Sequence, residues 1–253
     1  MVRGIFLEES FRRILEANIE EDGYIADNNK INKLLQENIF GVDINKEAID
    51  VTTFSLYLTI MDYKNPKTLD DYKFPNLKDN LFVSDFFDKE LNKKLEKKEF
   101  DLIIGNPPWG ALKGEHINYC KENNLPILRN EISRSFIFKV KNLCTINTKC
   151  CLVIPSSLFY KKSSQGVETR KILLKEIKIE KIIEMSAVRK LIFKNAIAPA
   201  SILIFRKDNT EYLENNIKYI SFKPNIFFEL FNIIAVEKND IKYIKQDFLL
   251  NND

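Results

Sequence analysis

The order of apolar and polar positions predicts short buried strands that alternate with amphipathic helices. Apolar runs that end on turn residues are typical of buried parallel strands, and they cover residues 39–44, 80–84, 101–105, 150–154, 179–184, 200–206 and 217–222. Helical spacing of apolar residues predicts helices over residues 4–19, 31–37, 46–62, 88–98 and 131–147. Strands alternating with helices in this way indicate an α/β fold.

Two polar stretches set the expected organisation of the chain. Residues 110–130 contain Gly110, Gly114 and Pro126, and connections this long are uncommon unless they serve a function. We expect this stretch to lie beside a ligand site. His116, the single histidine of the sequence, is interpreted as a loop residue because no second metal ligand accompanies it, so no metal site is predicted. Residues 1–210 are expected to form the main domain and residues 211–253 the start of a C-terminal extension.

Composition narrows the classes of protein only slightly. Hydrophobic residues make up 45% of the 253 residues, which suffices for a substantial core. The formal net charge of +3 is compatible with nucleic-acid binding without requiring it. No apolar segment has the length that a bilayer-spanning helix needs. The four cysteines show neither metal-ligand nor CxxC spacing, which favours reduced thiols and a cytoplasmic protein.

The clearest chemical signal is the Asn-Pro-Pro-Trp motif at residues 106–109, which directly follows the strand predicted over 101–105. Ligands of open α/β sheets bind at the carboxyl ends of strands. The Asn106 carboxamide oxygen and the Pro107 carbonyl could accept both hydrogens of an exocyclic amine, and the prolines would hold these acceptors rigidly. Trp109 offers a flat face for a base, which contributes roughly 1–3 kcal/mol per stacked base. The alternative is a Pro-Pro turn whose indole covers a core.

This motif, Asn106-Pro107-Pro108-Trp109, resembles the Asn-Pro-Pro-aromatic motif of amino-methyltransferases that use S-adenosylmethionine. Residues 4–207 resemble the adenine-specific DNA methyltransferases of restriction–modification systems. The resemblance implies a Rossmann-like sheet with helices on both faces and S-adenosylmethionine as cofactor. It also implies double-stranded DNA as partner, with adenine flipped into a pocket at residues 106–109.

Two acidic residues at predicted strand ends are candidates for holding the cofactor. A carboxylate at the position of Asp43 can accept hydrogen bonds from both ribose hydroxyls. Residues 41–49 resemble the family's ribose-binding segment, which implies that Ile44 packs on the cofactor adenine. The resemblance further implies that Asp85 accepts from the adenine amino group and that Phe86 lines that pocket. Asp43 could instead be a solvated strand-end carboxylate, and Asp85 could cap the following helix.

Further candidates for substrate contact lie in the second half of the chain. The resemblance makes Phe193 a candidate for packing on the far face of the flipped base, although a core phenylalanine looks the same in sequence. Residues 156–159 resemble the family's next motif and equally suit a strand-to-helix turn. A basic stretch could contact phosphates, although exposed helix faces are often rich in lysine; it comprises Lys161, Lys162, Arg170, Lys171 and Lys175.

One part of the family pattern is missing. Family members carry a glycine-rich segment after their first strand, and only Gly4 and the three residues after it resemble its tail. That strand would lie between the strands that end at Asp43 and Asn106. We therefore expect residues 1–253 alone to be weakly active at best, with a companion chain supplying the strand or a target-recognition domain. The alternatives are an inactive remnant that binds DNA or a subunit, and a methyltransferase of RNA or protein glutamine.

Overall fold

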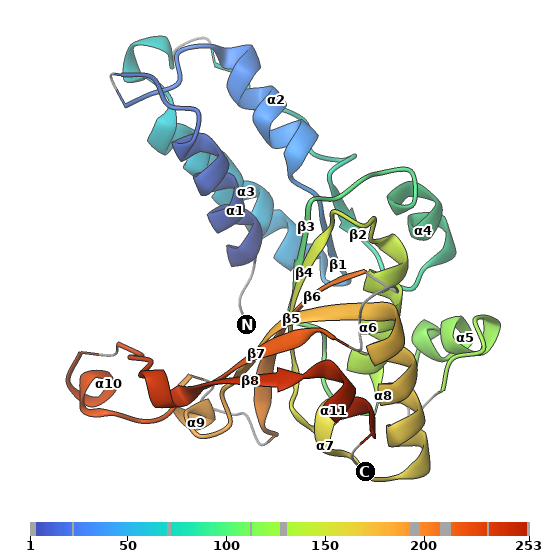
Figure 1. Cartoon of the computed structure of the whole chain (residues 1–253). Helices are drawn as coiled ribbons and strands as arrows, with labels where there is room; N and C mark the ends of the chain where they lie inside the picture. The colour runs from blue at the N-terminus through green and yellow to red at the C-terminus, as the bar shows by residue number, and fades with distance from the viewer. Residues whose placement is uncertain are drawn as a thin grey trace. The chain divides into compact units, whose positions relative to one another are not determined.

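The computed structural model describes residues 4–21, 23–69, 72–111, 113–126, 131–192, 198–207, 214–231 and 233–251. The chain divides into two compact units, Met1–Lys94 and Leu95–Asp253, each with its own sheet (Figure 1). The expected boundary between residues 210 and 211 stays a prediction, although β7 and β8, which follow it, extend the sheet of the second unit.

The first unit packs helices beside a two-stranded parallel sheet. Its strands are paired so that Gly41 faces Leu81 and Asp43 faces Val83. Helices α1, α2 and α3 share a core that includes Phe11, Leu35 and Leu56, all fully buried. In chain order the elements are α1 (Ile5–Glu16), α2 (Asn28–Asn38), β1 (Gly41–Asp43), α3 (Lys46–Tyr63), a 3-10 turn (Pro66–Thr68), β2 (Leu81–Val83) and α4 (Lys89–Leu95).

Side-chain caps fix where the helices of this unit begin. The Asn45 Oδ1 atom accepts from the backbone N–H groups of Glu47 at 2.8 Å and Ala48 at 3.3 Å, so Asn45 caps α3 as predicted. The residue that caps α4 is Asp88, which accepts from the Leu91 N–H at 2.8 Å. Asp85 accepts from the Phe87 N–H at 2.8 Å instead, so the alternative role of Asp85 as the helix cap is wrong.

The second unit is built on a six-stranded mixed sheet in the order β3-β4-β6-β5-β7-β8. β6 runs antiparallel to both β4 and β5, whereas β3 is parallel to β4 and β7 is parallel to β5. The strands are β3 (Leu102–Gly105), β4 (Lys149–Pro155), β5 (Ile177–Glu184), β6 (Ala200–Lys207), β7 (Asn216–Ser221) and β8 (Ile241–Lys245).

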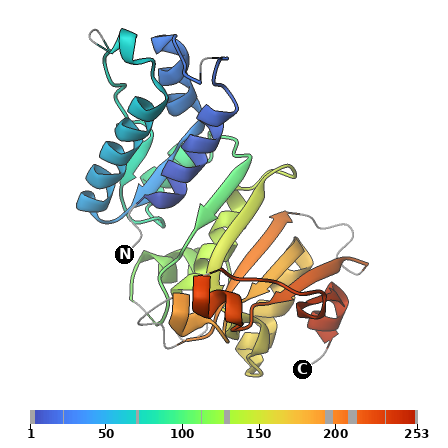
Figure 2. The same cartoon turned by 90° about the vertical axis from the view of Figure 1, so that its left-hand side faces the viewer.

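Helices cover the sheet of the second unit unevenly. α6 packs against β4 and α8 packs against β5, and both views place these two helices on the same side of the sheet (Figures 1 and 2). The helical elements are α5 (Glu115–Glu122), α6 (Ile132–Leu143), α7 (Ser157–Tyr160), α8 (Ser164–Glu176), α9 (Arg189–Ile192), α10 (Ile226–Phe231), a 3-10 turn (Lys238–Asp240) and α11 (Gln246–Asn251).

The long connection after β3 contains a helix that the sequence pattern did not indicate. α5 buries His116 and Cys120, which lie one turn apart, and the Cys120 Sγ atom lies 3.2 Å from the Ser135 Oγ atom of α6. The interpretation of His116 as a loop residue is therefore wrong. The sequence did not predict this helix because its buried side carries His116 and Cys120, which do not form an apolar stripe.

The strands of the two units are not paired with each other. Among the described residues, β1 pairs with β2 alone and β3 pairs with β4 alone. Across the described ranges, the helices all fall short of the length and apolar character that crossing a bilayer requires.

Candidate active site

The Asn-Pro-Pro-Trp motif lies at the carboxyl end of β3, as the sequence predicted. Asn106 and Pro108 are exposed, Pro107 is buried and Trp109 is half-buried. The Trp109 Nε1–H donates to the Val153 carbonyl of β4, with 3.3 Å between nitrogen and oxygen. The motif is thus tied to the neighbouring strand through its indole, while the Asn106 carboxamide remains open to solvent.

The indole of Trp109 rests on the sheet of the second unit. It packs against a small buried cluster, which consists of Met185, Val188 and Ala200, and Val153, Ile183 and Ile202 pack against the same cluster. Val153, Ile183 and Ile202 come from β4, β5 and β6, so three strands contribute side chains to the cluster against which the ring packs. A half-buried aromatic ring held in this way suits stacking against a flat ligand, since part of its surface is fixed and part is accessible.

A buried carboxylate lies at the same end of these strands. Glu184, 8% exposed, accepts from Ser156 Oγ at 2.8 Å, from Ser201 Oγ at 3.0 Å and from the Ser186 N–H at 3.0 Å. The Ser186 hydroxyl also donates to it. Sequence reasoning missed Glu184, although it is an acid at the end of an apolar strand, the signal that identified Asp43.

Two tyrosines extend this polar cluster to the surface. The Tyr160 and Tyr219 hydroxyls lie 3.2 Å apart, and Tyr160 is 55% exposed. Burial raises the pKa of Tyr160. Burial, and then the hydrogen bond that Tyr219 makes with Tyr160, raise the pKa of Tyr219. Both phenols therefore stay neutral near pH 7 and act through hydrogen bonds rather than charge.

In the first unit, Asp43 and Asp85 lie at the carboxyl ends of the neighbouring strands β1 and β2. The Asp43 Oδ1 atom accepts from the Asn45 N–H at 2.8 Å, and the Ser84 N–H donates to the Asp43 carbonyl at 3.0 Å. Each carboxylate is thus anchored through one oxygen to nearby backbone, because Asp85 binds the Phe87 N–H in the same manner. In the described part of the chain, no group donates to the second oxygen of either carboxylate.

Apolar side chains accompany these two acids. Ile44 follows Asp43 directly and is 72% exposed. Phe86 is half-buried and meets Phe87 edge to face, with 5.7 Å between the ring centroids. Each of the two strands, β1 and β2, thus has an anchored carboxylate and an apolar side chain at its carboxyl end. This arrangement suits a flat ring with polar substituents.

Gly4 begins α1 in a left-handed conformation with φ of 69°. A Cβ atom at this position would lie 2.3 Å from Thr52 Oγ1 of α3, whose hydroxyl donates to the Ala48 carbonyl. Glycine therefore serves both the backbone conformation and the close approach of α1 to α3. A contact of Gly4 with a cofactor stays a prediction.

We expect Gly4→Ala to lower the free energy of unfolding by about 2–4 kcal/mol, from the left-handed backbone together with the clash. Urea titration measures this. Gly23→Ala is the matched control, because Gly23 has φ of 84° but open space where a Cβ would lie. It should cost only about 1 kcal/mol. Equal losses in both variants would show that the approach to Thr52 is not tight.

The basic stretch divides between a buried and an open part. Arg170 is 4% exposed, and its Nη1 atom donates to the Phe159 and Lys161 carbonyls at 3.2 Å each. Arg170 therefore does not contact phosphates, because helical periodicity places it on the buried side of α8. Lys161 pairs with Glu131.

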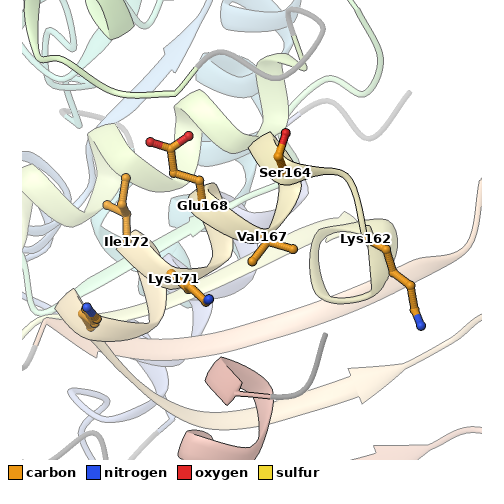
Figure 3. A pocket seen from close by; sticks show the side chains of 7 residues that line it. Lys162, Ser164, Val167, Glu168, Lys171 and Ile172 are labelled. Atoms are coloured by element: carbon orange, nitrogen blue, oxygen red, sulfur yellow. The ribbon is translucent and has the colours of Figure 1, made fainter.

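An open groove of about 620 Å³ follows the outer side of α8 (Figure 3). It is lined by Lys162, Ser164, Val167, Glu168, Lys171, Ile172 and Lys175.

The remaining candidate side chains are the base contact Phe193 and possible metal ligands. Phe193 lies outside the described residues, so its role as a base contact stays a prediction. Within the described ranges, no group of three or more His, Cys, Asp or Glu side chains is placed to hold a metal ion.

Relatives and solved structures agree on the kind of protein that this chain resembles. Over 200 residues the chain is 25% identical to the type II restriction enzyme and methyltransferase RM.Eco57I of Escherichia coli, covering 70% of this chain and 19% of that protein. It matches a DNA-bound type ISP restriction-modification enzyme, LlaBIII, with a TM-score of 0.65 at 14% identity, covering 98% of this chain and 18% of the other. A type I methyltransferase subunit from Streptococcus thermophilus gives 0.56 at 16% identity, covering 97% and 51%.

These likenesses show the fold of restriction-modification methyltransferases, and this chain spans about a fifth of the length of the curated relative. A family model for the Eco57I restriction-modification methylase matches residues 37–193, which is more than half of the chain. That range includes Asp43, Asp85 and the Asn-Pro-Pro-Trp motif. The chain therefore belongs to the Eco57I restriction-modification methylase family.

Proposed function

We propose that this chain is the catalytic part of a DNA methyltransferase that transfers a methyl group from S-adenosylmethionine to the exocyclic amine of adenine. Membership of a restriction-modification methylase family supports the reaction class. The observation that carries the proposal is the Asn-Pro-Pro-Trp motif at the end of β3, with its indole seated on the sheet and its carboxamide open to solvent.

Residues of the first unit fit the nucleoside part of the cofactor. Asp43 and Asp85 each keep an oxygen for donors of a ligand, which matches the ribose hydroxyls and the adenine amino group respectively. Ile44 and Phe86 supply apolar surface for the adenine ring. When bound, the cofactor supplies an electrophilic methyl group on its sulfonium. We assign no residue here to its methionine part beyond the prediction for Gly4.

The proposed chemistry depends on positioning at residues 106–109. The amine of adenine is a poor nucleophile, because its lone pair is delocalised into the ring. The Asn106 carboxamide oxygen and the Pro107 carbonyl accept its two hydrogens and draw the nitrogen toward a tetrahedral geometry. Trp109 stacks on the base and keeps the amine aligned for an in-line attack. No charged general base is required in the motif.

Double-stranded DNA is the proposed substrate, with adenine flipped out of the duplex. LlaBIII, which shares the fold, was solved bound to DNA. The residues that read the recognition sequence, and a companion segment that would supply the strand between β1 and β3, are proposed to lie outside residues 1–253. The cytoplasm, where such DNA is accessible, is the proposed location.

Incorporation of tritiated methyl groups into DNA, followed by digestion to nucleosides, tests the proposal. Calorimetry with S-adenosylmethionine accompanies it, first for the chain alone and then with a polypeptide that carries the missing strand and glycine loop. We expect label in N6-methyladenine, and tighter cofactor binding after the addition. Label in N4-methylcytosine would contradict adenine as the target. A sample that binds both cofactor and DNA yet transfers no label would contradict the enzymatic proposal.

The lysines of the α8 groove give a separate prediction about the path of DNA. If Lys171 and Lys175 contact phosphates, replacing either with alanine should weaken DNA binding equally for all sequences. It should also lower the slope of log K against log salt by about one per contact. Fluorescence anisotropy at several salt concentrations measures this. Lys97→Ala, a change at an exposed lysine outside α8 and its groove, is the control. An unchanged slope in both α8 variants would place the DNA elsewhere.

A further inference from the structure

We propose that Glu184 is the positioning residue for Trp109: its buried carboxylate holds the ends of β4, β5 and β6 in the register on which the indole rests. Glu184 touches neither base nor cofactor in this proposal, and it acts through the strands. The role of Trp109 as the base platform rests on the proposed function, whereas the link between Glu184 and Trp109 does not.

The hydrogen bonds of Glu184 join three strand ends. Ser156 directly follows β4, and Ser201 belongs to β6, where it pairs with Glu184 of β5. The carboxylate accepts from both hydroxyls, at 2.8 and 3.0 Å, and these hydroxyls lie 2.6 Å from each other. It also accepts from the Ser186 N–H, which fixes the chain just beyond β5. One side chain therefore fastens three consecutive strands of the sheet.

The indole of Trp109 and the Glu184 carboxylate lie on opposite faces of the sheet. Side chains of successive strand residues alternate between faces. Glu184 and Ser201 share a row with Ile154, and the adjacent row consists of Ile183, Ile202 and Val153. That adjacent row and Trp109 pack against the same buried cluster of Met185, Val188 and Ala200, and the Val153 carbonyl accepts from the indole N–H at 3.3 Å. A shift of any of these strand ends would therefore move the surface under the ring.

Burial makes the carboxylate hard to replace by an apolar side chain. Without Glu184, the Ser186 hydroxyl and N–H would lose this acceptor, and so would one of the Ser156 and Ser201 hydroxyls, since only one of that pair can donate to the other. Unsatisfied polar groups at a nearly closed site are strongly unfavourable. Glutamine differs from leucine in this respect. Its oxygen can accept from Ser156 and Ser186, and its amide can donate to Ser201 Oγ, whose own hydroxyl then turns to Ser156.

The experiment compares Glu184→Leu with Glu184→Gln and uses Glu180→Leu as the matched control. Glu180 lies on the same strand, and its carboxylate pairs with Lys149 at 3.0 Å and with Arg206. Trp109 is the single tryptophan of the sequence, so emission and acrylamide quenching report on it alone. We expect red-shifted emission and stronger quenching for Glu184→Leu, and wild-type values for the other two variants.

Either of two results would overturn the proposal. Folded Glu184→Leu with unchanged Trp109 emission would show that the carboxylate does not position the ring. If Glu184→Gln and Glu180→Leu shift the Trp109 emission as much as Glu184→Leu does, the cause is a general loosening of the sheet and not the loss of the Glu184 carboxylate. If Glu184→Leu does not fold, Ser201→Ala takes its place, and unchanged emission in that variant contradicts the proposal in the same way.

Methylation assays separate this inference from the proposed function. If wild-type protein methylates DNA, Glu184→Leu should lower kcat/KM on the order of 10-fold, the effect of a weakened base–aromatic stack, and Glu184→Gln should restore it. If wild-type protein methylates nothing, the proposed function fails, yet the fluorescence comparison still decides whether Glu184 positions Trp109.

Discussion

Asn106→Ala is expected to lower the rate of methyl transfer by about 10²–10³-fold, the loss typical of removing one preorganised hydrogen-bonding group from an active site. The carboxamide oxygen is proposed to accept one hydrogen of the target amine, and alanine offers no acceptor. Because Asn106 is exposed, the free energy of unfolding should change by no more than about 0.5 kcal/mol. The effect should therefore appear in the rate and not in stability.

Single-turnover transfer of tritiated methyl groups, with DNA and cofactor at saturating concentrations, measures this rate. Asn118→Ala is the matched control, since Asn118 is an exposed asparagine on α5 whose side chain bonds only Glu115 among the described contacts. Asn118→Ala should keep the wild-type rate. A near-wild-type rate for Asn106→Ala would show that the motif does not hold the reacting amine.

Features set by short stretches of sequence were predictable. Asn45 caps α3 because a side-chain acceptor before an amphipathic run is a local signal. The acid at Asp43 and the motif at Asn106 both follow apolar runs, and both lie at carboxyl ends of parallel strands in the structure. In these places the chain neighbours of a residue determine its position, so reading along the sequence suffices.

Features set by packing across the sheet were not predictable in the same way. Arg170 belongs to a basic run, yet its place on the helical period turns it toward two backbone carbonyls. Glu184 finds its partners in Ser156 and Ser201, which lie 28 and 17 residues away. The antiparallel direction of β6 leaves no trace in an apolar run, since an apolar run is the same in either direction.

The fold also explains why cofactor binding and base binding can be tested separately. Asp43 and Asp85 belong to the unit Met1–Lys94, whereas the Asn-Pro-Pro-Trp motif belongs to Leu95–Asp253. Each site is anchored inside its own unit, the first through the backbone of residues 43–87 and the second through β4. A substitution in one site should therefore leave the local structure of the other unchanged.

Asp43→Ala is accordingly expected to weaken S-adenosylmethionine binding by about 10²-fold while Trp109 emission stays unchanged. The carboxylate is proposed to accept from two ribose hydroxyls, and each hydrogen bond to a charged group contributes about 1.5–3 kcal/mol. Losing even one of them fully and the other in part corresponds to about a 10²-fold rise in Kd. Titration calorimetry of the chain together with the added polypeptide of the proposed binding experiment measures this. Asp50→Ala, which removes an exposed acid of α3 paired with Lys46 at 2.7 Å, should bind as wild type does. If Asp43→Ala binds S-adenosylmethionine as tightly as wild type does, the Asp43 carboxylate does not hold the ribose, and the proposed position of the cofactor is wrong.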